Sequence, residues 1–163
     1  MIAPTVLIVD DEAAFVDVLS RRLTLRGFEV VQANSGEQAL DLIGRVPNIE
    51  VAVLDLKMSG LDGLATLERI KQDYPLVEVI MLTGHGTVTS SVECLKAGAF
   101  DFLMKPTDAK SLAEKIETAA HQNRRNQNLV VSIRSSPSKT QQKMAEQADR
   151  FVRRALGLPD QAQ

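Results

Sequence analysis

The segment Val51-Ala52-Val53-Leu54-Asp55 decides the fold class, because it is an uninterrupted apolar run that ends on a carboxylate. Continuous Val, Ile and Leu runs of this length are typical of parallel strands that are buried on both faces of a sheet. Three further apolar runs each end on a polar residue: residues 5–9 before Asp10-Asp11, residues 77–82 before Thr83, and residues 100–104 before Lys105. Residues 28–33 alternate more loosely and are also expected to form a strand, which makes five strands together with the four apolar runs.

Helix-like segments separate these runs. They carry apolar residues at helical spacing and end at a glycine or before a proline. The expected helices cover residues 12–26, 34–46, 63–73, 87–97 and a fifth segment after Thr107-Asp108. The first carries Phe15, Val18, Leu19 and Leu23, and the fourth carries Val88, Val92 and Leu95. Strands that alternate with helices in this way predict an α/β fold, a doubly wound five-stranded parallel sheet with five helices and right-handed crossovers.

The last part of the chain differs in composition from the first. Residues 1–123 hold 18 acidic and 11 basic side chains, whereas residues 124–163 hold 3 acidic and 8 basic ones. We expect residues 1–123 to form the α/β domain. We expect residues 124–163 to form a basic linker, with a polar break at residues 123–128, and an amphipathic helix at residues 140–156, without an independent output domain. The apolar stripe of that helix is Met144, Ala148, Phe151, Val152, Ala155 and Leu156.

Composition also narrows the setting of the protein. Cys94 is the single cysteine, so no intrachain disulfide forms, and inside a helix it is expected to be an inert packing residue. No apolar stretch approaches the roughly 18 residues of a membrane helix, and the first residues lack the features of a signal peptide. We therefore expect a cytoplasmic protein that makes no contact with a membrane.

The polar residues at the strand ends form a chemically coherent set. Ligands of open α/β sheets bind outside the carboxyl ends of the strands, so Asp10, Asp11 and Asp55 should meet at one edge. Three neighbouring carboxylates repel one another unless a cation neutralises them, and oxygen ligands without His or Cys favour Mg²⁺. A carboxylate can act as a nucleophile toward phosphorus, while an ammonium (Lys105) and a hydroxyl (Thr83) can bind phosphoryl oxygens. The sequence therefore predicts a phosphoryl-transfer site.

The order of these motifs resembles that in the receiver domains of bacterial two-component response regulators, which are chemotaxis-regulator-like domains with a flavodoxin-like fold. The resemblance covers about residues 4–122. It is carried by Asp10-Asp11, by residues 55–63 (DLKMSGLDG), by residues 83–86 (TGHG) and by residues 96–106 (KAGAFDFLMKP). One departure is Ser59, where many relatives carry Pro; a slightly freer loop is expected there.

The resemblance implies a role for each matching residue. Asp55 would be the phosphorylation site and would accept a phosphoryl group from a sensor histidine kinase or a phosphotransfer domain. Asp10, Asp11, Asp55 and the backbone carbonyl of Lys57 would hold Mg²⁺. Thr83 and Lys105 would contact the phosphoryl group, Phe102 would be the switch aromatic, and the Lys105–Pro106 peptide would be cis.

The same resemblance implies a signalling phosphoacceptor and not an enzyme in the usual sense, since it catalyses only its own phosphorylation and slow dephosphorylation. Its output would be a changed surface on the fourth helix, fifth strand and fifth helix, used for a downstream protein target or a homodimer. His85 lies two residues after Thr83, a place from which it could affect attack by water.

Two alternatives remain open at this point. The chain could be the receiver portion of a DNA-binding or ATPase-type transcriptional regulator, although residues 124–163 are too short for a helix-turn-helix domain with its own core, and nucleic-acid binding by this chain alone is not expected. It could also be a phosphatase that forms an aspartyl phosphate. Such chemistry typically uses Asp-x-Asp after the first strand, where this chain has Asp10-Asp11-Glu12.

Overall fold

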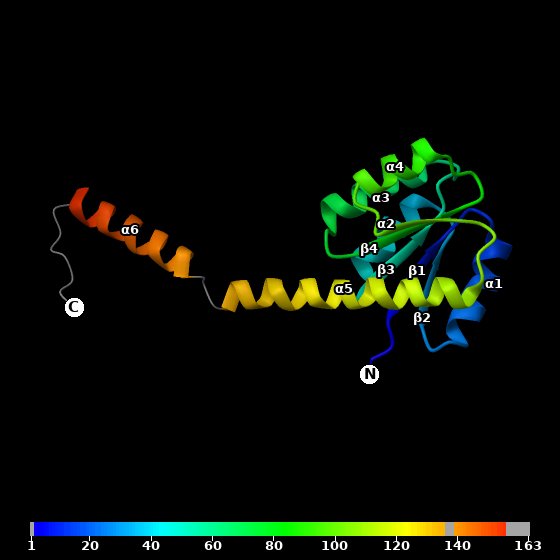
Figure 1. Ribbon diagram of the computed structural model, residues 1–163, viewed down its shortest axis with the longest axis horizontal. Helices are drawn as coiled ribbons and strands as arrows, with labels where there is room; N and C mark the ends of the chain where they lie inside the picture. Colours follow the sequence, from blue (N-terminus) through cyan, green and yellow to red (C-terminus); the bar gives the residue numbers. More distant parts are fainter. Residues whose placement is uncertain (1, 136–138, 156–163) are drawn as a thin grey trace. The chain divides into compact units, whose positions relative to one another are not determined.

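The computed structural model describes residues 2–135 and 139–155. Its sheet contains five parallel strands in the order β2-β1-β3-β4-β5 (Figure 1). The predicted five-stranded parallel sheet is therefore confirmed. The strands are β1 (Thr5–Val9), β2 (Glu29–Ala33), β3 (Ile49–Leu54), β4 (Glu78–Thr83) and β5 (Asp101–Met104).

A helix follows each strand, and the helices cover both faces of the sheet. The helices α2, α3 and α4 cover one face of the sheet, and α1 and α5 cover the other (Figure 1). The bounds are α1 (Ala13–Thr24), α2 (Gly36–Arg45), α3 (Gly63–Asp73), α4 (Val88–Lys96) and α5 (Ala109–Ser135). A sixth helix, α6, covers Lys139–Ala155.

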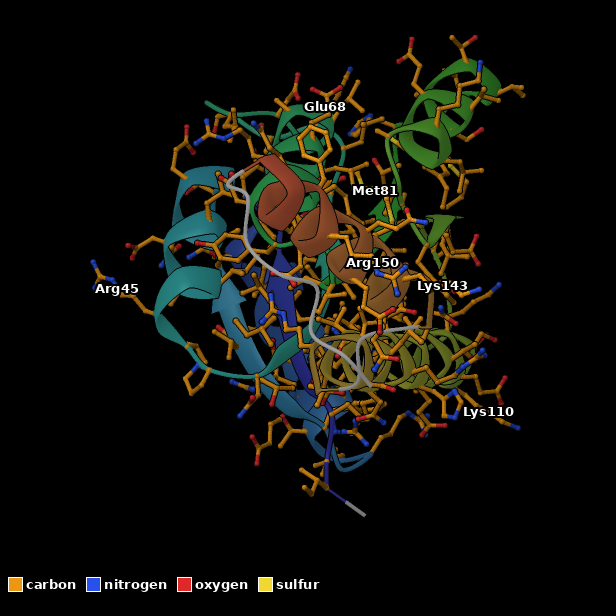
Figure 2. All side chains as sticks on the ribbon, turned by 90° about the vertical axis from the view of Figure 1, so that its left-hand side faces the viewer. Arg45, Glu68, Met81, Lys110, Lys143 and Arg150 are labelled. Carbon is orange, nitrogen blue, oxygen red and sulfur yellow. The ribbon has the colours of Figure 1, made fainter. Side chains whose placement is uncertain are left out.

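The central strands are buried on both faces, as their continuous apolar sequences predict. All residues of β3 and β4 are buried. Successive side chains point to opposite faces, so Val53 belongs to the core under α1 and α5, whereas Leu54 belongs to the other core. Polar side chains such as Arg45 and Lys110 point outward from the domain (Figure 2). Burial on two sides fixes the strand ends, and with them the residues that follow.

The apolar residues on one face of α4 are not covered by another element of the described residues. The side chains of Val88, Val92 and Leu95 are exposed, and Cys94 is the buried residue of this helix. Spacing grouped three residues correctly on one face but could not tell whether another element covers that face. The expected packing position of Cys94 is confirmed, because the residue is fully buried, and burial raises the pKa of its thiol. Val18 on α1 is likewise half exposed, while its neighbour Val16 is buried.

The polar break expected at residues 123–128 is wrong, because α5 continues through it to Ser135. Asn123 is buried and donates from Nδ2 to the carbonyl of Leu76 at 2.6 Å. Arg124 binds both carboxylate oxygens of the buried Glu50, at 2.6 and 2.9 Å. These polar side chains attach α5 to the residues near the starts of β3 and β4. Their hydrogen bonds explain why polar residues occur in the middle of this helix.

The chain forms two compact units, and the boundary between them lies between Asn126 and Gln127. In the second unit, α6 confirms a helix where residues 140–156 were expected to form one, although Leu156 lies outside the described residues. Met144 and Phe151 on this helix are exposed. Within residues 2–135 and 139–155, no helix combines the length and apolar character needed to cross a lipid bilayer.

Candidate functional site

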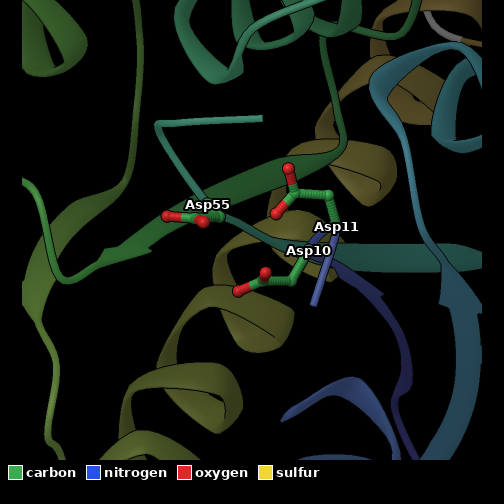
Figure 3. A group of neighbouring side chains, drawn as sticks. All are labelled: Asp10, Asp11 and Asp55. Carbon is green, nitrogen blue, oxygen red and sulfur yellow. The ribbon is translucent and has the colours of Figure 1, made fainter. Parts of the chain in front are cut away.

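Four neighbouring strands bring the predicted site residues to one edge of the sheet. Asp10 and Asp11 follow β1, Asp55 follows β3, Thr83 ends β4 and Lys105 follows β5. Since parallel strands end at the same edge, residues up to 95 positions apart come together there. The three carboxylates each offer an oxygen atom, and these atoms lie within 4.8 Å of one another (Figure 3).

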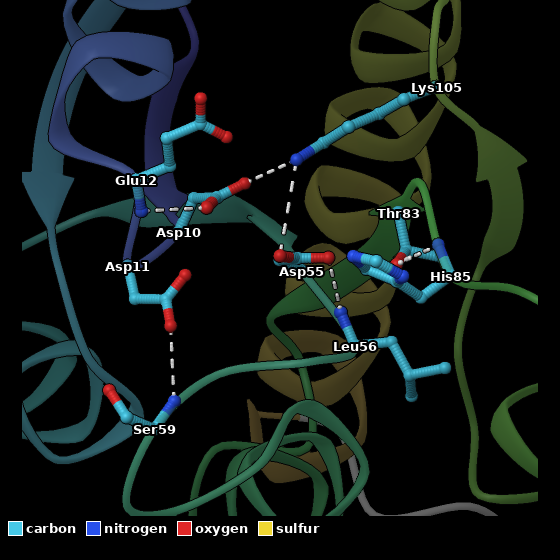
Figure 4. Close-up of polar contacts among 9 residues, drawn as sticks. All are labelled: Asp10, Asp11, Glu12, Asp55, Leu56, Ser59, Thr83, His85 and Lys105. Atoms are coloured by element: carbon cyan, nitrogen blue, oxygen red, sulfur yellow. Dashed lines mark hydrogen bonds and ion pairs between the residues drawn. The ribbon is translucent and has the colours of Figure 1, made fainter.

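Lys105 supplies positive charge to this acidic group. Its Nζ donates to Oδ2 of Asp10 at 2.6 Å and lies 3.9 Å from Oδ2 of Asp55 (Figure 4). Asp10 and Asp55 are both buried, with side-chain exposures of 3% and 7%. The cluster has three carboxylates, and the Lys105 ammonium pairs with two of them, so the site as described retains an excess of negative charge.

Asp55 has the most perturbed environment of these groups. Burial raises the pKa of its carboxyl above the ordinary value, and the negative charge of Asp10 adds to that effect. The Thr83 hydroxyl, the Lys105 ammonium and the Leu56 N–H act in the opposite direction and lower this pKa, but they do not cancel the effect of burial. Because burial disfavours the charged form, a bound cation would stabilise the carboxylate of Asp55.

Backbone N–H groups orient all three carboxylates. Leu56 donates to Oδ1 of Asp55 at 2.8 Å, and Glu12 donates to Oδ1 of Asp10 at 2.9 Å. The third bond, from Ser59 to Oδ2 of Asp11, measures 3.1 Å (Figure 4). Sequence reasoning missed this bond, since a slightly freer loop was expected at Ser59. Proline has no N–H, so a chain with Pro at this position could not make the contact.

The loop between β3 and α3 is held tightly at both ends. A Cβ atom on Gly63 would lie 2.1 Å from the carbonyl oxygen of Asp55, so only glycine permits this approach. Two residues before α3, the N–H of Leu61 donates to Oε1 of Glu37 on α2 at 2.9 Å. Hydrogen bonds from its own N–H and from that of Leu61 lower the pKa of the Glu37 carboxyl. The loop that carries Lys57 is thus anchored by two helices.

The loop after β4 connects Thr83 to the ring of Phe102. Thr83 is fully buried, and its Oγ1 accepts from the N–H of His85 at 3.1 Å. Phe102 on β5 is half-buried, and its ring lies against the backbone of Gly86, where a Cβ would come within 2.7 Å of Cε1. The loop after Thr83 therefore contacts the ring of Phe102 directly, which gives a physical path between the two residues.

Phe15 is a further residue of the site that sequence reasoning placed only on the apolar face of a helix. The Nζ atom of Lys105 lies 3.9 Å from the centroid of the Phe15 ring. Nothing in the spacing of α1 reveals this contact, because it depends on the loop after β5. The Lys105–Pro106 peptide of that loop is cis, as the resemblance implied.

The donor set fits a hard divalent cation. Asp10, Asp11 and Asp55 provide carboxylate oxygens only, and the excess of negative charge would be offset by two positive charges. Among the described residues, this is the group of acidic, His or Cys side chains close enough to hold a metal ion. The Lys57 carbonyl remains a predicted ligand, on the loop that begins at Asp55.

Comparisons with known proteins identify the family of the chain. The family model described as response regulator receiver domain matches residues 6–117. The transcriptional regulatory protein ZraR of Escherichia coli (strain K12) is 38% identical over 114 residues, which are 70% of this chain and 26% of that protein. The chain thus spans about a quarter of the length of the first curated relatives.

Solved structures give the same picture. A response regulator receiver domain protein from Clostridium thermocellum has a TM-score of 0.70 at 33% identity, over 74% of this chain and 97% of that one. The receiver domain of NtrX from Brucella abortus has a TM-score of 0.65 at 35% identity, over 71% of this chain and 98% of that one.

Proposed function

The chain belongs to the family of response regulator receiver domains, and we propose that Asp55 is its phosphoacceptor residue. The observation that carries the proposal is the convergence of a buried Asp55 with Asp10, Asp11 and Lys105 at one sheet edge. Among the three carboxylates, Asp55 directly follows β3, which lies between β1 and β4. It is therefore the carboxylate flanked by acidic groups on one side and by the Thr83 hydroxyl on the other.

The proposed reaction transfers a phosphoryl group from the phosphohistidine of a kinase or a phosphotransfer domain. A carboxylate oxygen of Asp55 attacks phosphorus, the P–N bond breaks, and the electron pair of that bond returns to the imidazole, which takes up a proton. Such a transfer requires positioning and neutralisation of the phosphoryl oxygens more than covalent help from the protein. Hydrolysis of the aspartyl phosphate by water would then return Asp55 to its carboxylate form.

Each neighbouring side chain has a task in this reaction. Lys105 would move from Asp10 toward a phosphoryl oxygen, and the Thr83 hydroxyl would donate to another. Mg²⁺, when bound by Asp10, Asp11, Asp55 and the Lys57 carbonyl, would supply positive charge that offsets the repulsion between the carboxylates and the phosphoryl group. The N–H groups of Leu56, Glu12 and Ser59 would keep the carboxylates oriented throughout.

The signal would leave through the surface of α4, β5 and α5. Movement of Thr83 toward the phosphoryl group would shift the loop that contacts Phe102, and the ring would turn inward. Exposed apolar side chains gather on this part of the chain: Val88, Val92, Leu95 and Met104. A downstream protein target, or a second copy of the chain in a homodimer, would bind there.

A second reading is supported by the length of the relatives. ZraR is a transcriptional regulatory protein, and the chain matches only 26% of it. We propose that this receiver domain regulates a transcriptional function, supplied either by a further part of the same protein or by a partner protein. The phosphoacceptor chemistry is the same under both arrangements.

Transfer from histidine kinases tests the proposed function. The protein is incubated with autophosphorylated kinases and Mg²⁺, and Asp55→Asn is compared with Asp101→Asn, whose carboxylate forms an ion pair with Lys115. Wild type and Asp101→Asn should take up labelled phosphate, and Asp55→Asn should take up none. Labelling of Asp55→Asn to the same extent as wild type would contradict the proposal.

A further inference from the structure

The ammonium of Lys105 has an aromatic neighbour in addition to its two carboxylate neighbours. Its Nζ lies 3.9 Å from the ring centroid of Phe15, 2.6 Å from Asp10 and 3.9 Å from Asp55. Phe15 comes from the first turn of α1, whereas Lys105 follows β5. The side chain of Lys105 is only 20% exposed, so the ring replaces water on one side of a largely desolvated cation.

From this geometry we infer that Phe15 is a positioning residue for phosphoryl transfer, which acts by holding the Lys105 ammonium toward Asp55 through a cation–π contact. The inference rests on the proposed function, because it assigns a task within the reaction at Asp55. An ammonium over an aromatic face is attracted by the ring quadrupole, and the attraction grows when water is excluded.

A ring suits this task better than another polar group would. Lys105 has to exchange its hydrogen bond to Asp10 for one to a phosphoryl oxygen on Asp55. A carboxylate or carbonyl in place of the ring would compete for the same N–H donors, whereas the face of Phe15 attracts the charge without accepting a directional hydrogen bond. The ammonium can therefore shift between its two oxygen partners while it remains over the ring.

The surroundings of the pair limit the other positions open to the lysine. The aliphatic part of Lys105 and the ring of Phe15 line a cavity of about 260 Å³ between α1 and the start of α5. Its lining holds no carboxylate and includes Arg22, so an ammonium that left the ring for this space would lose its anionic partners and approach a like charge. The remaining lining residues include Val18, Leu19, Leu82 and Pro106.

Phe15 also packs against the core under α1 and α5, so a purely structural role has to be separated from the positioning role. Phe15→Leu keeps an apolar side chain of similar bulk but has no ring, and Phe15→Tyr keeps the ring. Val18→Ala serves as the matched control, since Val18 lines the same cavity from the same helix. Circular dichroism and thermal unfolding establish that each variant is folded before the reaction is measured.

The test uses phosphoramidate as a small phosphodonor in the presence of Mg²⁺, with the full chain. The dependence of the rate on donor concentration separates apparent donor affinity from the limiting rate constant. In Phe15→Leu, we expect the limiting rate to fall by about three- to tenfold, in line with the strength of a partly desolvated cation–π contact. Phe15→Tyr and Val18→Ala should stay within about twofold of wild type. Equal limiting rates in wild type and Phe15→Leu would overturn the inference.

A second measurement separates this inference from the proposed function. Protons above the face of an aromatic ring resonate upfield, so the ε-methylene protons of Lys105 should be shifted upfield in wild type and Phe15→Tyr but not in Phe15→Leu. An unshifted signal in wild type would overturn the Phe15 contact, whatever the phosphorylation result. If Asp55→Asn were labelled as fast as wild type, the proposed function would fail, and the inference would fall with it.

Discussion

Lys105 donates a hydrogen bond to Asp10 at 2.6 Å, and this bond holds its ammonium at the edge of the acidic cluster. The Asp55 oxygen nearest to it is 3.9 Å away, which is beyond hydrogen-bond distance but within reach of a small side-chain movement. The arrangement is compatible with the proposed role of Lys105, which is to leave Asp10 and bind a phosphoryl oxygen on Asp55. It also predicts how the site responds when one of its charges is removed.

Removal of the Lys105 ammonium should separate phosphorylation from the conformational response. In Lys105→Ala, we expect Asp55 still to be phosphorylated by a small donor, at a lower rate, because the nucleophile and the metal ligands remain. The shifts of Phe102 on addition of beryllofluoride, measured by NMR, should be largely lost. Lys115→Ala, which removes an ammonium from the Asp101 ion pair instead, is the control. Identical Phe102 shifts in wild type and Lys105→Ala would contradict the coupling.

Removal of one carboxylate of the proposed Mg²⁺ site should weaken Mg²⁺ binding strongly. Asp11 is exposed and accepts from the N–H of Ser59, so Asp11→Ala should leave the fold intact. We expect the Mg²⁺ affinity, measured by calorimetry, to fall by at least roughly tenfold, since even partners of a metal's ligands typically contribute that much. Asp17→Ala on the exposed side of α1 is the control. Unchanged affinity in Asp11→Ala would exclude Asp11 as a ligand.

The raised pKa of Asp55 makes a signed prediction about stability. The folded protein binds a proton at Asp55 more tightly than the unfolded chain does. As the pH rises above 3.8, the ordinary pKa of this carboxyl, its ionisation therefore lowers the free energy of unfolding. In EDTA at about pH 7, Asp55→Asn should therefore unfold at a higher urea concentration than wild type. The difference should shrink as the pH approaches 3.8. A neutral or destabilising effect at the higher pH would contradict the assigned environment.

The contact between Asn123 and the carbonyl of Leu76 should contribute measurably to stability. Asn123→Ala leaves a carbonyl without its 2.6 Å donor, and we expect a loss of about 1–3 kcal/mol in the free energy of unfolding. Asn128→Ala makes the same change at an exposed position of α5 and should stay within about 0.5 kcal/mol of wild type. Equal stabilities of the two variants, measured by urea unfolding, would show that the Asn123 bond has no net effect.

Much of the fold follows from the sequence because its physical causes are local in the chain. Apolar runs such as residues 51–54 are buried on both sides in a parallel sheet, and each ends where the next residue meets solvent or ligand. Asp10, Asp55 and Lys105 were predicted to converge for that reason alone, and they do. Their chemical roles stay predictions, because convergence of side chains does not by itself reveal a reaction.

The features that the sequence did not reveal depend on contacts between distant segments. Asn123 and Arg124 suggested a break in the helix, because asparagine and arginine have no partner visible in the sequence; Leu76 and Glu50 supply those partners in the fold. Phe15 meets Lys105 only because the loop after β5 returns to α1. The exposed face of α4 illustrates the converse case, in which the pattern is correct but the covering element is absent among the described residues.

Phosphorylation of Asp55 is tested most directly by chemical identification of the phosphorylated residue. The protein is phosphorylated with Mg²⁺ and a small phosphodonor, and borohydride then reduces the aspartyl phosphate to homoserine, which mass spectrometry of the resulting peptides assigns to a position. We expect homoserine at position 55 and aspartate at positions 10 and 11. Homoserine at either of those two positions, or full phosphorylation with unchanged aspartate at position 55, would contradict this expectation.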